Sequence, residues 1–457
     1  MLKIKHCYWH SMNFRLNKSV ILLSFKKNLN DMKSVAVKFM LMVVFSFALA
    51  RAIGNDSTKV KHRNADEITL KLPAGFTAVS IAENVGKNRH IAVNANGDLY
   101  VKLSKLKNGK GIIVLKESGG KAKIVNSFGD FAGTGIAIKN GYVYASNDQE
   151  VFRYKMNDKG GVDPSQKPEK IITSLIDRRQ HESKPITLDN DGNIYVTIGA
   201  PSNSCQVKDR EKGSPGQDPC ALLDSTGGIW QFKADKLNQT YKDGTRYATG
   251  IRNAMGIEWN DEVNDLYATQ HGRDGLFQMF PELYDEKQGA ELPAEEMLRV
   301  KKGSDFGWPY CYYDQFQNKK VLAPEYGGDR MKQGRCEGVD TPVAAFPGHW
   351  APNDIIFYTG DQFPEKYKHG AFIAFHGSWN RAPLKQKGYN VVFVPLKDGQ
   401  LDGEYEVFAD GFMGAPEIES PDDAKTRPCG LAQAADGSLY ISDSVTGRIW
   451  KISYKKP

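Results

Sequence analysis

The chain has 457 residues, of which 40% are hydrophobic and 25% are charged, so it is long enough to bury a large core in one domain or several. Its formal net charge of +7 lies in residues 1–50, which carry eight Lys and Arg against one acidic residue, whereas the remaining residues hold 53 of each sign. Because a protein that binds the phosphate backbone needs a basic surface on its folded domain, nucleic acid is excluded as a partner.

The N-terminal segment has the pattern of a secretory signal. From Met32 a short basic stretch precedes the apolar run Phe39–Ala50 and then small residues suited to cleavage. This run is too short for a comfortable membrane span, and a retained membrane anchor is the alternative. We therefore predict an extension and signal peptide over 1–52, a mature domain over 53–457 with no stable membrane span, and a periplasmic or secreted location.

Six short segments share one pattern, in which a turn leads into a strand of alternating side chains. Asn-Gly and Asp-Gly accept positive φ, so such pairs predict tight turns between the strands of a hairpin. In chain order the segments are NANGDLYVKL from Asn94, IKNGYVYAS from Ile138, DNDGNIYVTIG from Asp189, NDEVNDLYATQHG from Asn260, KHGAFIAFHG from Lys368 and AADGSLYISDS from Ala434.

Further strands follow several of these hairpins. They are EVFRY from Glu150, GGIWQF from Gly227, GYNVVFVPL from Gly388 and GRIWKISY from Gly447. This spacing fits four-stranded blades with long insertions between them. We therefore predict an all-β fold, a six-bladed β-propeller with long inter-blade loop insertions, in which the segment near Leu72 shares a blade with the final strand. A β-sandwich or a pair of β domains is the alternative.

Four cysteines flank two polar loops. Cys205 and Cys220 bracket one loop that contains Gly and Pro, and Cys311 and Cys336 bracket another. A disulfide stabilises such a loop by restricting the unfolded chain, so we predict one bridge across each loop and a free thiol at Cys429. Four cysteines allow three pairings, so this assignment is a hypothesis. Disulfides in both loops agree with an oxidising compartment.

Polar and cationic residues cluster at the predicted strand ends from the third hairpin onward. In a propeller the ends of the inner strands converge on the central channel, so these residues are expected to face one shared site. They are His181 in RRQHESK, Arg252 and Asn253 in GIRNAMG, Gly272 and Arg273 in QHGRDG, His349 in PGHWAPND, Trp379, Asn380 and Arg381 in HGSWNR, and Arg427 in TRPCGLA.

The ordered set of motifs resembles the glucose/sorbosone dehydrogenase family. The motifs are HESKPITLDNDGNIYVTIGAPSN, GIRNAMGIEW, QHGRDG, LPAEEM, DFGWPYCYYD, HWAPND, FYTGDQFP, HGSWNRAP, GYNVVFVP and RPCGLAQAADGSLYISD, and the match runs from about Leu72 to Tyr454. The resemblance implies a sugar dehydrogenase on a six-bladed propeller that depends on pyrroloquinoline quinone (PQQ).

PQQ is a flat ortho-quinone with three carboxylates, so its site needs cations, a flat surface to stack on and a Lewis acid near the reactive carbonyl. Arginine side chains present planar groups that match carboxylates with two hydrogen bonds, and tryptophan rings at 350 and 379 offer flat surfaces. We expect the cofactor contacts to be Arg252, Asn253, His349, Trp379, Asn380, Arg381 and Arg427.

The resemblance also implies the roles of the reacting groups. His181 lies ten residues before Asp191 of the following turn, which is the family spacing of the general base, and an imidazole suits proton transfer near neutral pH. Arg252 is expected over the quinone oxygen where negative charge develops. The backbone carbonyls of Gly272 and Arg273 are the expected ligands of a calcium ion.

Two departures from the family bear on the substrate. Cys429 stands where the better-known soluble glucose dehydrogenases carry a second arginine, and HGSWNR is closer to the L-sorbosone dehydrogenase branch. We predict oxidation of a sugar or sugar aldehyde, with electrons passed to a separate cytochrome or quinone acceptor, because the sequence has no Cys-x-x-Cys-His haem motif. The alternatives are a calcium-dependent propeller lactonase or hydrolase and a non-catalytic secreted binding propeller.

Overall fold

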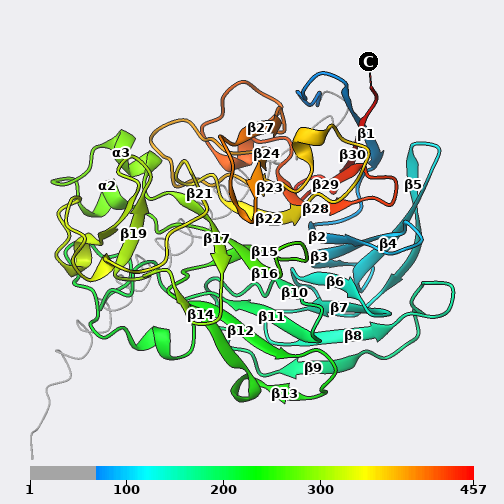
Figure 1. The fold of residues 1–457 in the computed structure, drawn as a ribbon, viewed down its shortest axis with the longest axis horizontal. Helices are drawn as coiled ribbons and strands as arrows, with labels where there is room; N and C mark the ends of the chain where they lie inside the picture. Colours follow the sequence, from blue (N-terminus) through cyan, green and yellow to red (C-terminus); the bar gives the residue numbers. More distant parts are fainter. Residues whose placement is uncertain (1–67, 457) are drawn as a thin grey trace, which may run out of the picture. The chain divides into compact units, whose positions relative to one another are not determined.

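The computed structural model describes residues 68–456, so the predicted signal segment lies outside the described residues. Within this range six antiparallel sheets surround a common centre (Figure 1), which confirms the predicted six-bladed propeller. The innermost strands of successive sheets are neighbours, and the last of them, β28 (Pro428–Gln433), lies beside the first, β2 (Asn88–Val93). The ring is therefore closed.

The first three blades run outward from β2, β6 and β10. The first blade is β2, β3 (Leu99–Lys107), β4 (Lys110–Ser118) and β5 (Lys121–Phe128). The second is β6 (Ile136–Lys139), β7 (Tyr142–Ser146), β8 (Val151–Lys155) and β9 (Glu169–Thr173), with β13 (Gln239–Thr240) added in parallel. The third is β10 (Ile186–Leu188), β11 (Asn193–Ile198), β12 (Gly228–Lys233) and β14 (Thr245–Thr249), with β18 (Ser304–Asp305) added in parallel.

The last three blades run outward from β15, β22 and β28. The fourth blade is β15 (Ala254–Asn260), β16 (Asp265–Gln270), β17 (Glu295–Val300) and β21 (Ala344–Phe346). The fifth is β22 (Pro352–Phe357), β23 (Ala371–Phe375), β24 (Asn390–Val394) and β27 (Glu406–Ala409). The sixth is β28, β29 (Leu439–Asp443), β30 (Ile449–Tyr454) and β1 (Phe76–Ala82).

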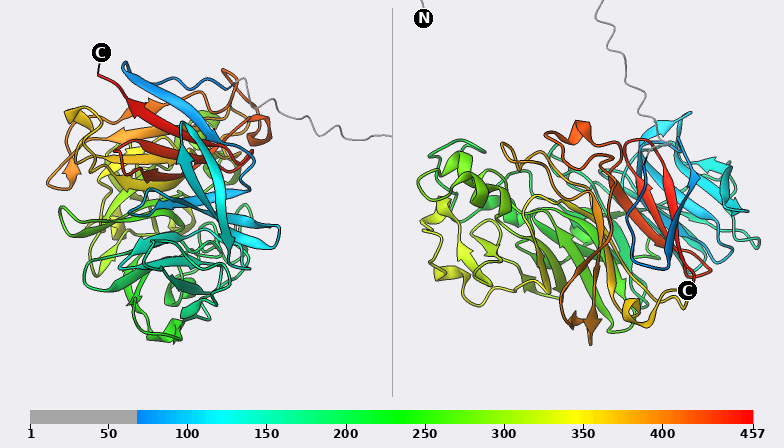
Figure 2. Two further views of the ribbon diagram at one scale, coloured as in Figure 1. Left: turned by 90° about the vertical axis from the view of Figure 1, so that its right-hand side faces the viewer. Right: turned by 90° about the horizontal axis from the view of Figure 1, so that it is seen from above.

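Strand β1 completes the blade that ends the chain, as the sequence predicted. It pairs antiparallel with β30, with Phe76 opposite Tyr454, and so joins the two ends of the described chain in one sheet. Figure 2 shows the blue first strand beside the red last strand in both views. The predicted hairpins also form, and the turn between β10 and β11 uses Gly192 at a φ of 77°, a conformation in which a side chain is strained. Hydrophobic cores fill the spaces between neighbouring blades.

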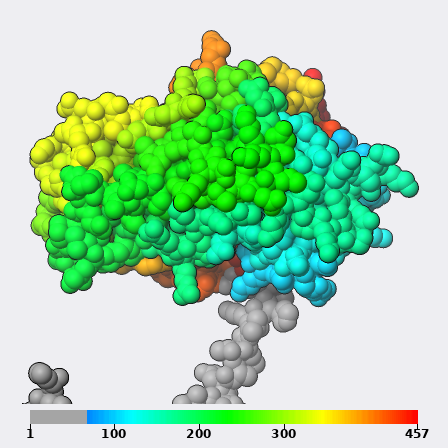
Figure 3. Space-filling model, turned by 90° about the horizontal axis from the view of Figure 1, so that it is seen from below, coloured from blue at the N-terminus to red at the C-terminus, as the bar shows by residue number. Residues whose placement is uncertain are grey.

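The longest insertions gather at one side of the propeller, beside the third and fourth blades. They contain the short helices α2 (Leu276–Met279) and α3 (Glu286–Glu291). Loops of the fold also form two small hairpins. One pairs β19 (Cys311–Asp314) with β20 (Lys319–Leu322), and the other pairs β25 (Leu396–Lys397) with β26 (Gln400–Leu401). The part with α2, α3 and β19 lies opposite the cyan first blades (Figures 1 and 3). Among the described residues, no helix has the length and apolar character needed to cross a membrane.

The two predicted disulfides are both present, between Cys205 and Cys220 and between Cys311 and Cys336. Cys429 is a free and fully buried thiol, also as predicted. Each bridge closes one insertion loop. By the chain-entropy model a loop of this size gains about 3 kcal/mol from its bridge, so both loops are held as defined parts of the fold.

A cavity of about 390 Å³ occupies the centre of the ring and is lined by the six inner strands. Glu258 on β15 and Asp354 on β22 line it, with His90 on β2 at 3.8 Å from the Asp354 carboxylate. Burial and, to a smaller extent, repulsion from Asp261 raise the pKa of Glu258 to about 8, although attraction to Lys139 offsets part of this rise. The Glu258 carboxyl is therefore mostly protonated at neutral pH.

We expect Glu258→Gln to reduce the loss of stability at alkaline pH. A carboxyl whose folded pKa is raised stabilises the protein below its unfolded pKa, near 4.5, and this contribution is lost as the pH rises through 8. The variant should therefore show a smaller fall in the free energy of unfolding between pH 5 and 9, measured by urea titration. The exposed Glu365→Gln serves as control, and equal slopes for both variants and the wild type would refute the assignment.

Candidate functional site

The predicted site residues come from one edge of the propeller. In an antiparallel blade the start of the first strand and the end of the second strand lie at the same edge. Arg252 precedes β15 and His271 follows β16, whereas His349 precedes β22 and His376 follows β23. The same edge therefore receives loops from successive blades, which is why residues far apart in sequence meet there.

The carboxylate of Asp274 is the centre of this edge. It accepts hydrogen bonds from Arg252 Nη2 at 2.8 Å, from Arg210 Nη2 at 2.8 Å and from Asn380 Nδ2 at 2.7 Å, and it is only 8% exposed. Burial by itself would raise the pKa of Asp274, but Arg252 and other neighbouring positive charges outweigh it and hold the pKa well below its usual range. Asp274 is thus ionised at neutral pH.

Arg252 is buried and each part of its guanidinium group has a partner. Nε donates to the carbonyl of Asn203 at 3.2 Å, Nη1 to the carbonyl of Gly272 at 2.9 Å, and Nη2 to Asp274. The planar group is therefore held in one orientation at the start of β15. Of the predicted cofactor contacts, Arg252 and Asn380 meet at Asp274.

His181 and Asn253 lie together on either side of the end of β11. A Cβ at Gly199 would come within 2.6 Å of the His181 Cβ and 3.0 Å of the Asn253 Oδ1, so this close approach requires glycine. His181 Nδ1 lies 2.6 Å from the carbonyl of Ala200, which makes Nδ1 the protonated nitrogen and leaves the Nε2 lone pair as the acceptor.

The imidazole of His181 is neutral in the free protein. Burial is the larger cause and the charge of Arg252 the next, and together they lower the pKa of His181 to about 3. The effect of Arg252 also shows that the two predicted reacting groups lie close enough to interact. A neutral imidazole with a free Nε2 has the form that a general base needs.

Two further histidines and two arginines at this edge, Arg89 and Arg210, were missed by the sequence analysis. His271 and His376 directly follow β16 and β23. Burial, and next the charge of Arg252, lowers the pKa of His271 to about 4, and burial and Arg427 lower the pKa of His376. Arg89, at the start of β2, is a further charge that lowers both pKa values. Its signal was the motif NRHIAV, which places an arginine at the start of an inner strand much as RNAMGI does.

Arg427 reaches the same edge from the sixth blade. Nε donates to the carbonyl of His376 at 2.9 Å and Nη2 to the carbonyl of Gly377 at 2.5 Å. Its guanidinium carbon lies 5.6 Å from the ring centre of Tyr389, a distance at which a cation–π contact contributes. Backbone carbonyls and an aromatic ring hold this cation, so no carboxylate binds its guanidinium group in the described structure.

Three further predicted contacts have different surroundings. Arg381 is fully buried and donates to Glu291 at 2.6 Å and to the carbonyls of Ala290 and Gly348, so its hydrogen bonds fix α3 and the loop before β22. His349 is also buried, with Nε2 3.1 Å from the carbonyl of Gly289, although its Nδ1 lies 3.8 Å from Asp274. Trp379 is 66% exposed. Trp350 packs edge-on against Phe375 within the fold.

One of the two carbonyls of the predicted calcium clamp is already bound by a protein group. The Gly272 carbonyl accepts from Arg252, and the Arg273 side chain forms a buried ion pair with Glu325 at 2.5 Å. Glu295 binds the Gly272 N–H at 3.0 Å, and burial raises the pKa of Glu295 to about 8. Within residues 68–456, no three His, Cys, Asp or Glu side chains are placed to hold a metal ion.

Positive charge exceeds negative charge at this edge. Four guanidinium groups gather there. The neighbouring carboxylates are Asp274, paired with Arg252 and Arg210, Asp209, 3.9 Å from Arg210, and Asp443, which accepts from the Arg427 backbone N–H at 2.7 Å. Glu295 and the three histidines are neutral around pH 7. Such a site favours a ligand with several negative charges. The four cations are Arg89, Arg210, Arg252 and Arg427.

The fold and the site define a propeller with a cationic, histidine-bearing edge. The chain belongs to the TrAA12-like family, whose model matches residues 70–455. A PQQ-dependent sugar dehydrogenase of Hypocrea jecorina is 23% identical over 92% of this chain and 97% of its own length. An uncharacterised protein of Borreliella burgdorferi is 25% identical over 86% of this chain and 93% of its own.

Solved structures give the same fold. A Trichoderma reesei structure of Carbohydrate-Active Enzymes Family AA12 superposes with a TM-score of 0.67 and 20% identity, and it covers 84% of this chain and 98% of the other. At this identity the likeness shows the fold alone.

We expect Asp274→Ala to destabilise the protein strongly. The change leaves Arg252 buried without its charge partner, and loss of one member of a buried ion pair costs about 3–5 kcal/mol. The free energy of unfolding in urea measures this loss. Asp361→Ala removes an exposed partner of Lys368 and should change stability by less than about 1 kcal/mol. If Asp274→Ala lowered the free energy of unfolding as little as this control, the Asp274 carboxylate would not be the required partner of Arg252.

Proposed function

We propose that this protein is a PQQ-dependent oxidoreductase that oxidises a sugar or sugar aldehyde. The observation that carries the proposal is the excess of arginine charge around neutral histidines at one edge of the propeller. This arrangement suits a polyanionic quinone better than the metal-centred hydrolase or the binding propeller, because a hydrolase metal would need converging carboxylates. Membership of the TrAA12-like family supports the same reading.

The donor set fits the cofactor. Arg252 is fixed in orientation, and Arg427 is held by carbonyls without a carboxylate on its guanidinium group, so both can meet carboxylates or quinone oxygens without losing a charge partner. Asn253 and Asn380 add amide groups beside them. When bound, PQQ supplies the acceptor for a hydride from the sugar carbon. The exposed ring of Trp379 remains a proposed stacking surface.

His181 is proposed to take the proton of the sugar hydroxyl. Its Nδ1 is bonded to the Ala200 carbonyl, so Nε2 is the nitrogen that accepts the proton. The same hydrogen bond fixes the ring, and the carbonyl stabilises the imidazolium that forms after transfer. Arg252 would stabilise the negative charge that develops on the acceptor, at a site where burial strengthens that interaction.

Calcium remains a proposal that rests on the resemblance. As the residues lie, the Gly272 carbonyl is bound by Arg252, and a divalent cation there would repel that guanidinium group. In this arrangement Arg252 would have to leave the Gly272 carbonyl before calcium could bind there, so we derive no step through the ion. Turnover with PQQ, measured in a calcium chelator and again after calcium is returned, tests this ligand directly.

The electron acceptor and the location of the protein complete the proposal. The sequence has no Cys-x-x-Cys-His motif, so we propose that a separate cytochrome or quinone takes the electrons. Two disulfides favour an oxidising compartment, and we propose that the mature protein works in the periplasm or outside the cell.

We expect His181→Ala to lower turnover by about 10²- to 10⁴-fold, the usual contribution of a positioned general base. PQQ binding, followed by the absorbance of the bound quinone, should be nearly unchanged because the arginines remain. His369→Ala is the control, since His369 is an exposed histidine paired with Glu262. Turnover close to that of the wild type with saturating PQQ and sugar would show that the base lies elsewhere.

We expect Arg427→Ala to weaken PQQ binding and to leave the melting temperature nearly unchanged. Its guanidinium group is half-buried and bound by carbonyls, so its loss removes a cation available to the cofactor. Arg381→Ala should show the reverse pattern, because its buried pair with Glu291 holds α3. A quinone titration and a thermal melt of each variant measure the two effects. Equal PQQ affinity in wild type and Arg427→Ala would remove Arg427 from the cofactor site.

A further inference from the structure

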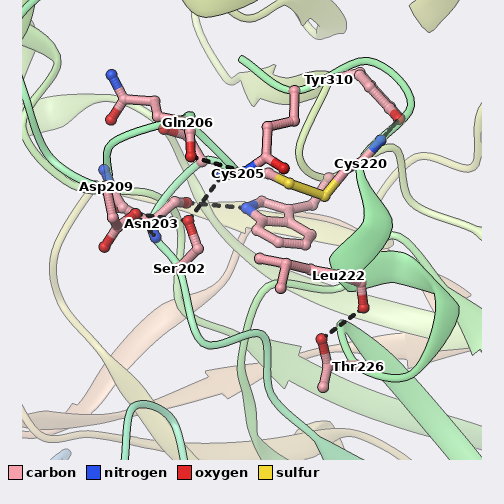
Figure 4. The surroundings of a disulfide bond; sticks show 12 residues. Ser202, Asn203, Cys205, Gln206, Asp209, Cys220, Leu222, Thr226 and Tyr310 are labelled. Atoms are coloured by element: carbon pink, nitrogen blue, oxygen red, sulfur yellow. Dashed lines mark hydrogen bonds between the residues drawn. A yellow bond between two sulfur atoms is a disulfide. The ribbon is translucent and has the colours of Figure 1, made fainter. Parts of the chain in front are cut away.

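The disulfide loop between β11 and β12 contributes Asn203 to the site, in addition to Arg210. The loop spans residues 199–227 and carries the Cys205–Cys220 bridge, and Asn203 is fully buried. Figure 4 shows Asn203 beside this bridge, and its backbone carbonyl accepts a hydrogen bond from Trp308 Nε1. Asn203 ends the motif HESKPITLDNDGNIYVTIGAPSN, but neither the predicted site nor the proposed mechanism gives it a role.

The side-chain amide of Asn203 binds the backbone of Asp274 on both sides. Oδ1 accepts from the Asp274 N–H at 2.8 Å, and Nδ2 donates to the Asp274 carbonyl at 2.9 Å. The amide therefore acts both as acceptor and as donor to one residue, as the backbone of a paired β-strand does. These two bonds fix the backbone of Asp274, and with it the direction in which the carboxylate points.

The backbone carbonyl of Asn203 binds the other member of the ion pair. It accepts from Arg252 Nε at 3.2 Å and from Trp308 Nε1 at 3.0 Å, which uses both of its lone pairs. One residue thus contacts both Arg252 and Asp274, whose side chains meet at 2.8 Å.

The loop itself is rigid around Asn203. Asp209 accepts from the Asn203 N–H at 2.9 Å and from Ser202 Oγ at 2.6 Å, and Ser202 Oγ in turn accepts from the Cys205 N–H at 2.9 Å. The Cys220 N–H donates to Tyr310 Oη at 2.8 Å on the far side of the bridge. The disulfide therefore anchors the short segment that presents Asn203.

We propose that Asn203 is a positioning residue, which holds Arg252 and Asp274 in register for the oxidation reaction. The inference rests on the proposed function, because the Asn203 side chain holds Asp274, and Asp274 holds Arg252, the group proposed to act in the reaction. Only an amide has the required donor and acceptor at this spacing, since an aspartate would lose the donor and an alanine would lose both. The backbone carbonyl remains in every variant, so the side chain can be tested separately.

A double-mutant cycle tests this coupling. Asn203→Ala, Arg252→Ala and the double variant are compared for kcat, KM and PQQ affinity. Loss of a group that orients a functional residue typically costs about 10- to 100-fold, and we expect a loss of this size in kcat for Asn203→Ala. In the Arg252→Ala background the same change should have little further effect, because the group that it positions is gone.

Asn193→Ala is the matched control. Asn193 is also a buried asparagine at the third blade, bonded to Asp189 and Lys233, and its loss affects stability without touching the site. Its effect on kcat should be small, and it should be the same with and without Arg252. The proposal would be overturned if Asn203→Ala lowered kcat by the same factor with and without Arg252, or if the coupling of Asn193 to Arg252 in kcat equalled that of Asn203.

If the proposed function is wrong, the wild-type protein itself shows it. Wild-type protein that neither binds PQQ nor oxidises any sugar in a dye-coupled panel would contradict the function itself. A crystal structure of Asn203→Ala then decides the inference about the ion pair without any activity. Displacement of Arg252 from Asp274 supports the positioning role, whereas an unchanged 2.8 Å contact refutes it.

Discussion

The buried ion pair between Arg252 and Asp274 is the contact on which the site depends. Removing two charges from water costs free energy that their attraction barely repays, so such a pair adds little to stability. What it provides is a single geometry, since other hydrogen bonds hold both groups in place while two of the five N–H donors of Arg252 remain for a ligand. Arg210 and Asn380 bind the carboxylate, whereas Gly272 and Asn203 bind the guanidinium group. Loops from three blades therefore converge on one pair of charges.

The loop edge and the central cavity of the propeller carry different ionisable groups. At one edge, arginines and neutral histidines meet at the loop ends. In the central cavity, burial raises the pKa of both Glu258 and Asp354, to about 8 for Glu258. A raised pKa reduces the negative charge that these buried acids carry, so they oppose the positive field of the cationic edge less than free carboxylates would.

The sequence predicted the blades well because their signals are local. Asn-Gly and Asp-Gly turns, alternating strands and the two cysteine-bracketed loops each depend on a few adjacent residues, and all were found. The site was predicted only in part. Strand-end positions placed Arg252, Asn253 and His181 together, but they do not determine where a loop side chain points, and Arg381 turns instead toward Glu291. Asn203 and Arg210 come from an insertion whose path depends on its tertiary contacts.

The charge excess also connects cofactor binding with the strength of the proposed base. In the free protein, burial and then Arg252 hold the pKa of His181 near 3, far below the value at which an imidazole is an efficient base at neutral pH. A polyanion bound to Arg252 would cancel part of the positive charge that disfavours the imidazolium. The pKa of His181 would then rise when the cofactor is in place. Arg252 would in this way hold the quinone and make proton transfer to His181 depend on the presence of the quinone.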